Sequence, residues 1–201
     1  MPRTIYITDA NTRLGRAVAV RLGRAGWNLV LGGGSLSNLR ALCEQLPHAA
    51  TLPKRCMPTD RGNVLPVLDA AEERFGSLDA VLMNSRARGS RLSDLMAMQV
   101  TALSTVADAA RGPLARAGGH FVIAGTRPGP DSLRGAARTI ARDAARTLAA
   151  GLQSDWEADA LRLSLVEPRG ADTPDALARR IVRVLNGAGD ANVRDGRAVA
   201  A

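Results

Sequence analysis

A regular alternation of short apolar runs and longer helical runs constrains the fold of this chain more than any other feature. Residues 3–8 (RTIYIT) form a β-branched run typical of a strand, and residues 13–24 carry apolar side chains at helical spacing. The alternation continues along the 201 residues, with Ser35 as a predicted helix N-cap. Further strands are predicted at 28–31, 55–59, 78–83, 120–124, 161–166 and 197–200, and further helices at 35–46, 63–75, 91–116, 132–154 and 174–186.

Strands that alternate with helices favour parallel βαβ units. The sequence therefore predicts an α/β protein: one domain over residues 1–201, built as a doubly wound parallel sheet in three α/β/α layers. Sheets of this kind bind ligands at the carboxyl ends of their strands, near the switch in strand order. The loop after the first strand is then the place to look for a dinucleotide site.

Composition indicates a soluble, cytoplasmic protein. Hydrophobic residues make up 46% of the chain and charged residues 23%, which excludes a disordered chain, and no apolar stretch is long enough for a membrane span. Cys43 and Cys56 lack the spacing of metal ligands, so no metal site is expected. The net charge of +8 comes from dispersed arginines, and with only 2% aromatic residues the chain is not expected to bind nucleic acid.

The loop after the first predicted strand reads TDANTRLG over residues 8–15. It resembles the TGxxxGxG loop of the short-chain dehydrogenase/reductase family, with Thr8 and Gly15 in place. Asp9 and Arg13 stand where that family has its first two glycines. The resemblance implies a Rossmann-like fold, and it continues through nearly the whole chain.

Further matches follow in the order that the family shows them. Asp60 stands where the family has an acidic residue after its third strand, and FGSLDAVLMNS (75–85) is similar to FGxLDxLVNNAG, with Asn84 retained. GGHFVIAGT (118–126) resembles GGxIVNISS and puts Thr126 at the position of the catalytic serine. LRLSLVEPR (161–169) resembles IRVNAVAPG.

The family's catalytic tyrosine and the lysine four residues later have no counterpart in this chain. Matching AARTLAAGL (144–152) to the family pattern ALTRSLAAEL puts Arg134 at the tyrosine and Arg138 at the lysine. An alternative register, counted from Thr126, puts Thr139 and Asp143 there. Neither register supplies a tyrosine–lysine pair, and an arginine cannot exchange a proton usefully near neutral pH.

An argument without alignment leads to the same result. The sole tyrosine is Tyr6, in the first strand, and the sole lysine is Lys54, so no Tyr-x-x-x-Lys motif exists. The missing glycines and the Asp9 carboxylate also weaken the phosphate loop. We therefore expect no cofactor. Weak residual binding of NADP is left open, at the remnant positions Thr8, Arg13, Gly15, Asp60 and Asn84.

Four arginines, at 134, 138, 142 and 146, follow one face of a predicted helix. One interpretation is a solvated face that Asp143 partly neutralises. The alternative is an anion-binding mouth in the remnant cleft beside Thr126, formed by Arg134 and Arg138 together with Arg86 and Arg88.

In the family, the helices that correspond to 91–116 and 132–154 pair into a four-helix bundle between subunits. That resemblance places Leu103 and Leu148 at an interface. The resulting hypothesis is a catalytically inactive, structural partner subunit of an active ketoreductase in polyketide or fatty-acyl biosynthesis, with homodimerisation and an acidic carrier protein as further partner options. The alternatives are a cofactor-independent isomerase, dehydratase or cyclase, or a residual NAD(P)-binding oxidoreductase.

Overall fold

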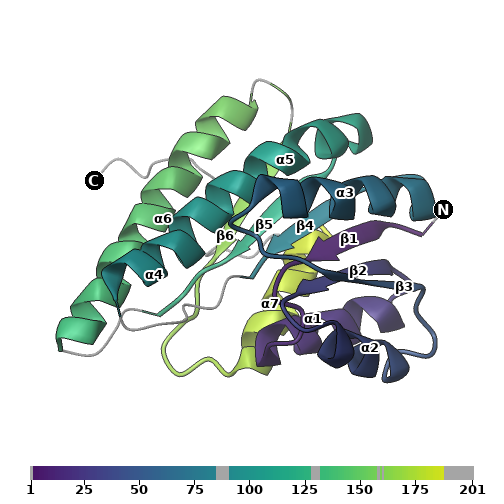
Figure 1. Ribbon diagram of the computed structural model, residues 1–201, viewed down its shortest axis with the longest axis horizontal. Coiled ribbons are helices and arrows are strands. Elements are labelled where there is room, and N and C mark those ends of the chain that lie inside the picture. The colour runs from purple at the N-terminus through teal and green to yellow at the C-terminus, as the bar shows by residue number, and fades with distance from the viewer. Residues whose placement is uncertain (1, 85–90, 128–131, 158, 160, 188–201) are drawn as a thin grey trace.

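Six parallel strands form one sheet in the order β3-β2-β1-β4-β5-β6 (Figure 1). The computed structural model describes residues 2–84, 91–127, 132–157, 159 and 161–187. This strand order confirms the predicted doubly wound α/β fold, and the predicted last strand at 197–200 lies outside the described residues. The strands are β1 (Thr4–Ile7), β2 (Asn28–Gly33), β3 (Thr51–Arg55), β4 (Ala80–Met83), β5 (His120–Ala124) and β6 (Arg162–Val166).

Helices cover both faces of the sheet. One face carries α1, α2 and α7, and the other carries α3, α4, α5 and α6 (Figure 1). Among the described residues, no helix is both long enough and apolar enough to cross a membrane. The helices are α1 (Arg13–Arg24), α2 (Leu36–Glu44), α3 (Arg61–Phe75), α4 (Leu92–Met96), the π-helix η1 (Ala97–Thr101), α5 (Ala102–Ala117), α6 (Leu133–Glu157) and α7 (Pro174–Leu185).

The switch in strand order lies at β1, which pairs with β2 on one side and β4 on the other. All four residues of β1 and all four of β4 are buried, as expected for parallel strands with helices on both faces. The carboxyl ends of β1 and β4 therefore lie side by side, and the loops that follow them meet there.

Two predicted elements differ from the structure. The third strand covers Thr51–Arg55 rather than 55–59, because Pro53 and Lys54 resemble a loop in sequence but are tolerated on the edge of a sheet. The predicted helix at 91–116 is interrupted by the π-helix Ala97–Thr101. Ser35 caps α2 as predicted, since its side chain accepts a hydrogen bond from the backbone N–H of Asn38.

The structure does not place Leu103 at an interface. Its side chain is only 1% exposed and lies in the core between the sheet and α3, α5 and α6. Leu148 packs, partly buried, against the same core. Leu103 therefore fills the core of this chain itself, and the large apolar side chains that α6 exposes are Leu133 and Ile140.

The first turn of α1 packs closely against the loop after β1. A Cβ added to Gly15 would lie 2.7 Å from the Cα of Ala10 and 2.8 Å from its carbonyl oxygen. These atoms belong to the backbone and cannot rotate away. The position of α1 relative to β1 therefore depends on the missing side chain at residue 15.

We predict that Gly15→Ala destabilises the protein by about 1–3 kcal/mol, the usual cost of overpacking. Gly151→Ala is the matched control, because Gly151 also lies in a helix but has no atom within 4 Å of an added Cβ. That substitution should raise stability by up to about 1 kcal/mol through helix propensity. Urea unfolding followed by circular dichroism measures both, and equal shifts of the same sign would contradict the packing argument.

His120 lies at the amino end of β5, far from the carboxyl ends of the strands, and is buried. Its Nε2 shares a 2.8 Å hydrogen bond with Ser164 Oγ. Burial, with a smaller contribution from the Arg162 charge, lowers the pKa of His120 from 6.5 to about 4. This histidine is therefore a neutral core residue at physiological pH.

The lowered pKa predicts a loss of stability in acid. Between pH 6.5 and 4 the unfolded chain binds a proton at His120 that the folded chain does not, so the free energy of unfolding falls as the pH falls. The full effect amounts to about 3 kcal/mol. In His120→Gln, thermal melts at pH 7.0, 5.5 and 4.5 should show a shallower decline than in the unchanged protein. Parallel declines would show that other groups control the acid sensitivity.

Candidate functional site

The loop between β1 and α1 keeps a tight turn without the usual glycine. Asp9 adopts φ 44°, the left-handed conformation that aspartate tolerates better than most residues. Thr12 then caps α1, with its Oγ1 accepting from the backbone N–H of Gly15 at 3.1 Å. The sequence suggests that the tight turn after β1 is lost, but the structure shows that it is present.

Asn84, which follows β4, ties this loop to the neighbouring strand. Its Nδ2 donates to Thr12 Oγ1 at 2.8 Å and to the carbonyl of Asp9 at 3.3 Å. Its backbone N–H donates to Thr8 Oγ1 at 2.8 Å. The predicted remnant positions Thr8, Gly15 and Asn84 thus meet at the switch point and hold the loop in shape.

Tyr6 belongs to the core and takes no part in the site. It is fully buried in β1, and burial is the largest cause that raises its pKa well above the usual value of 10.0. Cys56 and, to a smaller extent, the charge of Asp9 raise the pKa of Tyr6 further. Asp9 itself is buried, with only 7% of its surface exposed.

The ends of β2 and β3 differ in what they offer a ligand. Asn11 Oδ1 is buried without a hydrogen-bond partner among the described residues and lies near the end of β2, 3.4 Å from a Cβ added to Gly33. Gly34 has open space around it. Asp60, by contrast, is engaged as the N-cap of α3, where it accepts from the backbone N–H of Gly62 at 2.8 Å.

A cleft lies at the carboxyl ends of β4, β5 and β6. Thr126, just after β5, donates a 3.3 Å hydrogen bond to Oε1 of Gln99. Gln99 is buried, and it lies on the π-helix, a rare local geometry that is frequent at functional sites. Apolar residues complete the floor of the cleft. Its lining comprises Met83, Gln99, Leu103, Ile123, Ala124, Gly125, Thr126, Arg142, Ala145, Arg146, Leu165 and Glu167.

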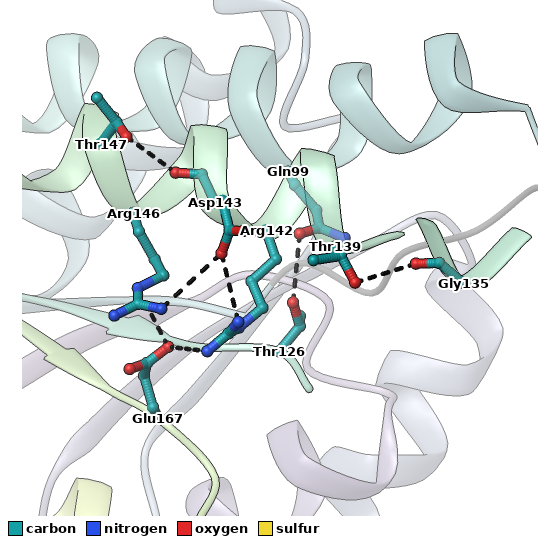
Figure 2. A network of polar contacts seen from close by, with 9 residues as sticks. All are labelled: Gln99, Thr126, Gly135, Thr139, Arg142, Asp143, Arg146, Thr147 and Glu167. Atoms are coloured by element: carbon teal, nitrogen blue, oxygen red, sulfur yellow. Dashed lines mark hydrogen bonds and ion pairs between the residues drawn. The ribbon is translucent and has the colours of Figure 1, made fainter. Parts of the chain in front are cut away.

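A charged network forms the other wall of the cleft, and Figure 2 shows it projecting from α6 toward Glu167. Arg142 Nη2 lies 3.0 Å and Arg146 Nε 3.5 Å from Glu167 Oε1. Asp143 approaches the same guanidinium groups at 3.3 and 3.8 Å. The sequence arguments named Thr126 and Asp143 but missed Gln99, Arg142 as a cleft residue, and Glu167.

The structure does not bring the predicted arginine mouth together. Arg134 and Arg138 are exposed on α6 and do not line the cleft, while Arg86 and Arg88 lie outside the described residues. Thr139 appears beside Gln99 and Thr126 (Figure 2), as the alternative register requires. Within the described part of the chain, no group of His, Cys, Asp or Glu side chains could hold a metal ion.

No protein-family model matches the chain. An uncharacterized oxidoreductase of Mycobacterium tuberculosis is 28% identical over 181 residues, which are 83% of this chain and 66% of that protein. The match therefore spans slightly less than two thirds of that relative. Levodione reductase of Leifsonia aquatica is 34% identical over 91 residues, which are 43% of this chain and 34% of that enzyme.

Two solved structures share the fold over almost their whole length. An alcohol dehydrogenase from the archaeon Thermococcus sibiricus, complexed with 5-hydroxy-NADP, has a TM-score of 0.82 at 20% identity, covering 92% of this chain and 91% of that one. A metagenomic short-chain oxidoreductase in complex with NADP has a TM-score of 0.80 at 20% identity, covering 91% and 90%.

These similarities contradict three expectations from the sequence: an inactive partner subunit, a chain that is not an enzyme, and the absence of a cofactor. The curated relatives are named oxidoreductases and reductases, and the solved neighbours hold a nicotinamide nucleotide. The physical reason is visible at Asp9, whose left-handed backbone replaces the glycine that the sequence argument treats as essential. The strand order and these similarities together show that the chain has the fold of the short-chain oxidoreductases.

Proposed function

We propose that the chain is a nicotinamide-dependent oxidoreductase that reduces a carbonyl compound. The observation that carries this proposal is the position of the Thr126–Gln99 pair in a cleft that shares Met83 with the β1–α1 loop. Met83 lines the cleft, and its Sδ lies 3.7 Å from Thr8 Oγ1. A dinucleotide on the loop and a substrate in the cleft would thus be neighbours.

The residues around the loop fit a dinucleotide. The N-terminus of α1 carries unpaired N–H groups and a positive dipole end, which suit a phosphate. Arg13 is exposed in the first turn of α1, so its guanidinium can pair with a phosphate from outside the turn. Asn11 Oδ1 is a buried acceptor that a cofactor hydroxyl or amine can satisfy. The NADP in both structural neighbours supports the same cofactor here.

Asn11, Arg13 and the N-terminus of α1 would hold the dinucleotide, which would provide the hydride for reduction of a carbonyl carbon. The Thr126 hydroxyl donates its one proton to Gln99 Oε1 in this structure. With a substrate in the cleft, the hydroxyl would turn and donate that proton to the carbonyl oxygen instead. The alkoxide that forms on the substrate would take this proton, and water would return a proton to Thr126. The sequence has no tyrosine–lysine pair to do this work.

Thr126→Ala tests the proposal. It removes the hydroxyl and should lower kcat/KM for NADPH-dependent reduction of a panel of short aldehydes and ketones on the order of a hundredfold. Thr126→Ser keeps the hydroxyl and should stay within about tenfold of the unchanged protein. NADPH binding, measured by calorimetry, should be equal in all three proteins, because Thr126 lies in the substrate cleft.

Two results would contradict the proposal. One is the absence of NADPH binding at millimolar concentration in the unchanged protein. The other is equal turnover by Thr126→Ala and the unchanged protein, which would place the chemistry outside this cleft.

A further inference from the structure

The cleft contains more positive charge than its own walls neutralise. Two guanidinium groups, those of Arg142 and Arg146, line it together with one carboxylate, that of Glu167. Both arginines share a single oxygen of that carboxylate, Oε1. The second negative charge, on Asp143, belongs to a side chain that is 57% exposed, where solvent screens it. The interior of the cleft is therefore cationic.

One donor of this network is unused. Arg142 Nε is buried and has no hydrogen-bond partner among the described residues. The Arg142 side chain as a whole is 19% exposed. Buried N–H groups are rarely left without an acceptor, and an arginine fork matches a planar or tetrahedral oxyanion. The unused donor points to a ligand with anionic oxygens.

Glu167 is held in the cleft by its backbone rather than by its carboxylate alone. Arg180 Nη1 of α7 donates to the Glu167 carbonyl at 2.7 Å. Gly125 leaves room on the other side, since an added Cβ would lie 3.0 Å from Glu167 Cγ. The main chain at residue 167 is thus fixed, while its carboxylate, with one oxygen shared by two arginines, can turn away without disturbing the fold.

Building on the proposed function, we propose that the substrate carries an anionic group beside its carbonyl, and that Arg142 and Arg146 bind this group in exchange for Glu167. The guanidinium groups face the same cleft as Thr126 (Figure 2), so a short carbonyl compound can reach both. Glu167 neutralises the arginines while the cleft is empty. Neutral carbonyl compounds leave the Glu167 pairing intact and gain nothing from the arginines.

Two sets of measurements test this proposal. The first is NADPH-dependent reduction of acetoacetate and of its neutral methyl ester. The second is binding of acetate, methanesulfonate and inorganic phosphate to the protein without cofactor, followed by calorimetry, which identifies the preferred oxyanion. The variants are Arg142→Gln, Glu167→Gln and, as a matched control, Arg138→Gln. The control removes the same charge from an exposed position one turn away on α6, outside the cleft.

Arg142→Gln should weaken binding of the best anion about tenfold and raise KM for acetoacetate by a similar factor, with little change for the ester. Glu167→Gln should tighten anion binding, because it removes the competing charge and keeps the shape of the side chain. Arg138→Gln should leave both unchanged. This pattern separates a binding role from a structural one, since simple loss of structure would weaken binding in both cleft variants.

The proposal is overturned if none of the three anions binds, if Arg142→Gln and Arg138→Gln have equal effects, or if Glu167→Gln fails to tighten binding. Equal kcat/KM for acetoacetate and its ester would likewise overturn it, while leaving the proposed reductase function intact. Anion binding with the expected variant pattern, but without reduction of either compound, would refute the reductase function and retain the anion site.

Discussion

Parallel pairing at the switch point between β1 and β4 determines where everything else in this protein can lie. Because β1 and β4 run side by side in register, the turn after β1 and the residue after β4 meet, and Asn84 joins them through Thr8, Asp9 and Thr12. β5 and β6 then extend the same edge and place Thr126 and Glu167 in one cleft. The strand order of the sheet therefore determines where the site lies, and the side chains determine what it can bind.

The sequence predicts the sheet well because buried parallel strands and amphipathic helices leave a strong periodic signal. Residues 13–24 and 120–124 form the predicted elements with the predicted bounds, and Ser35 caps α2. The edge strand β3 has no comparable signal, since Pro53 and Lys54 need not face a core. The loop after β1 is harder still: residue types alone suggest a broken turn, while the backbone shows Asp9 in the left-handed conformation. The fold was therefore predictable wherever burial dictates the residue type. The cofactor loop was not predictable, because its shape depends on the backbone angle of one residue, Asp9.

The rotation of successive residues around α6 explains why the sequence predicted the wrong pair of arginines in the cleft. Residues four apart on an α-helix drift by about 40° at each step, so four arginines at this spacing fan out over about 120°. Arg134 and Arg138 end on the exposed side, whereas Arg142 and Arg146 face Glu167. Sequence spacing alone does not predict which of these arginines face the sheet, because that depends on how α6 crosses β5 and β6.

Charge balance links the shape of this cleft to its selectivity. A half-buried guanidinium without a counter-ion is costly, so Arg142 and Arg146 require a negative partner at all times, and Glu167 provides one. An anionic ligand that displaces Glu167 preserves this balance, because one carboxylate leaves as another oxyanion enters. A neutral ligand cannot make this exchange. To contact the arginines, its dipole would have to compete with the full negative charge of Glu167. The pairing that stabilises the empty cleft is therefore the same one that discriminates between ligands by charge.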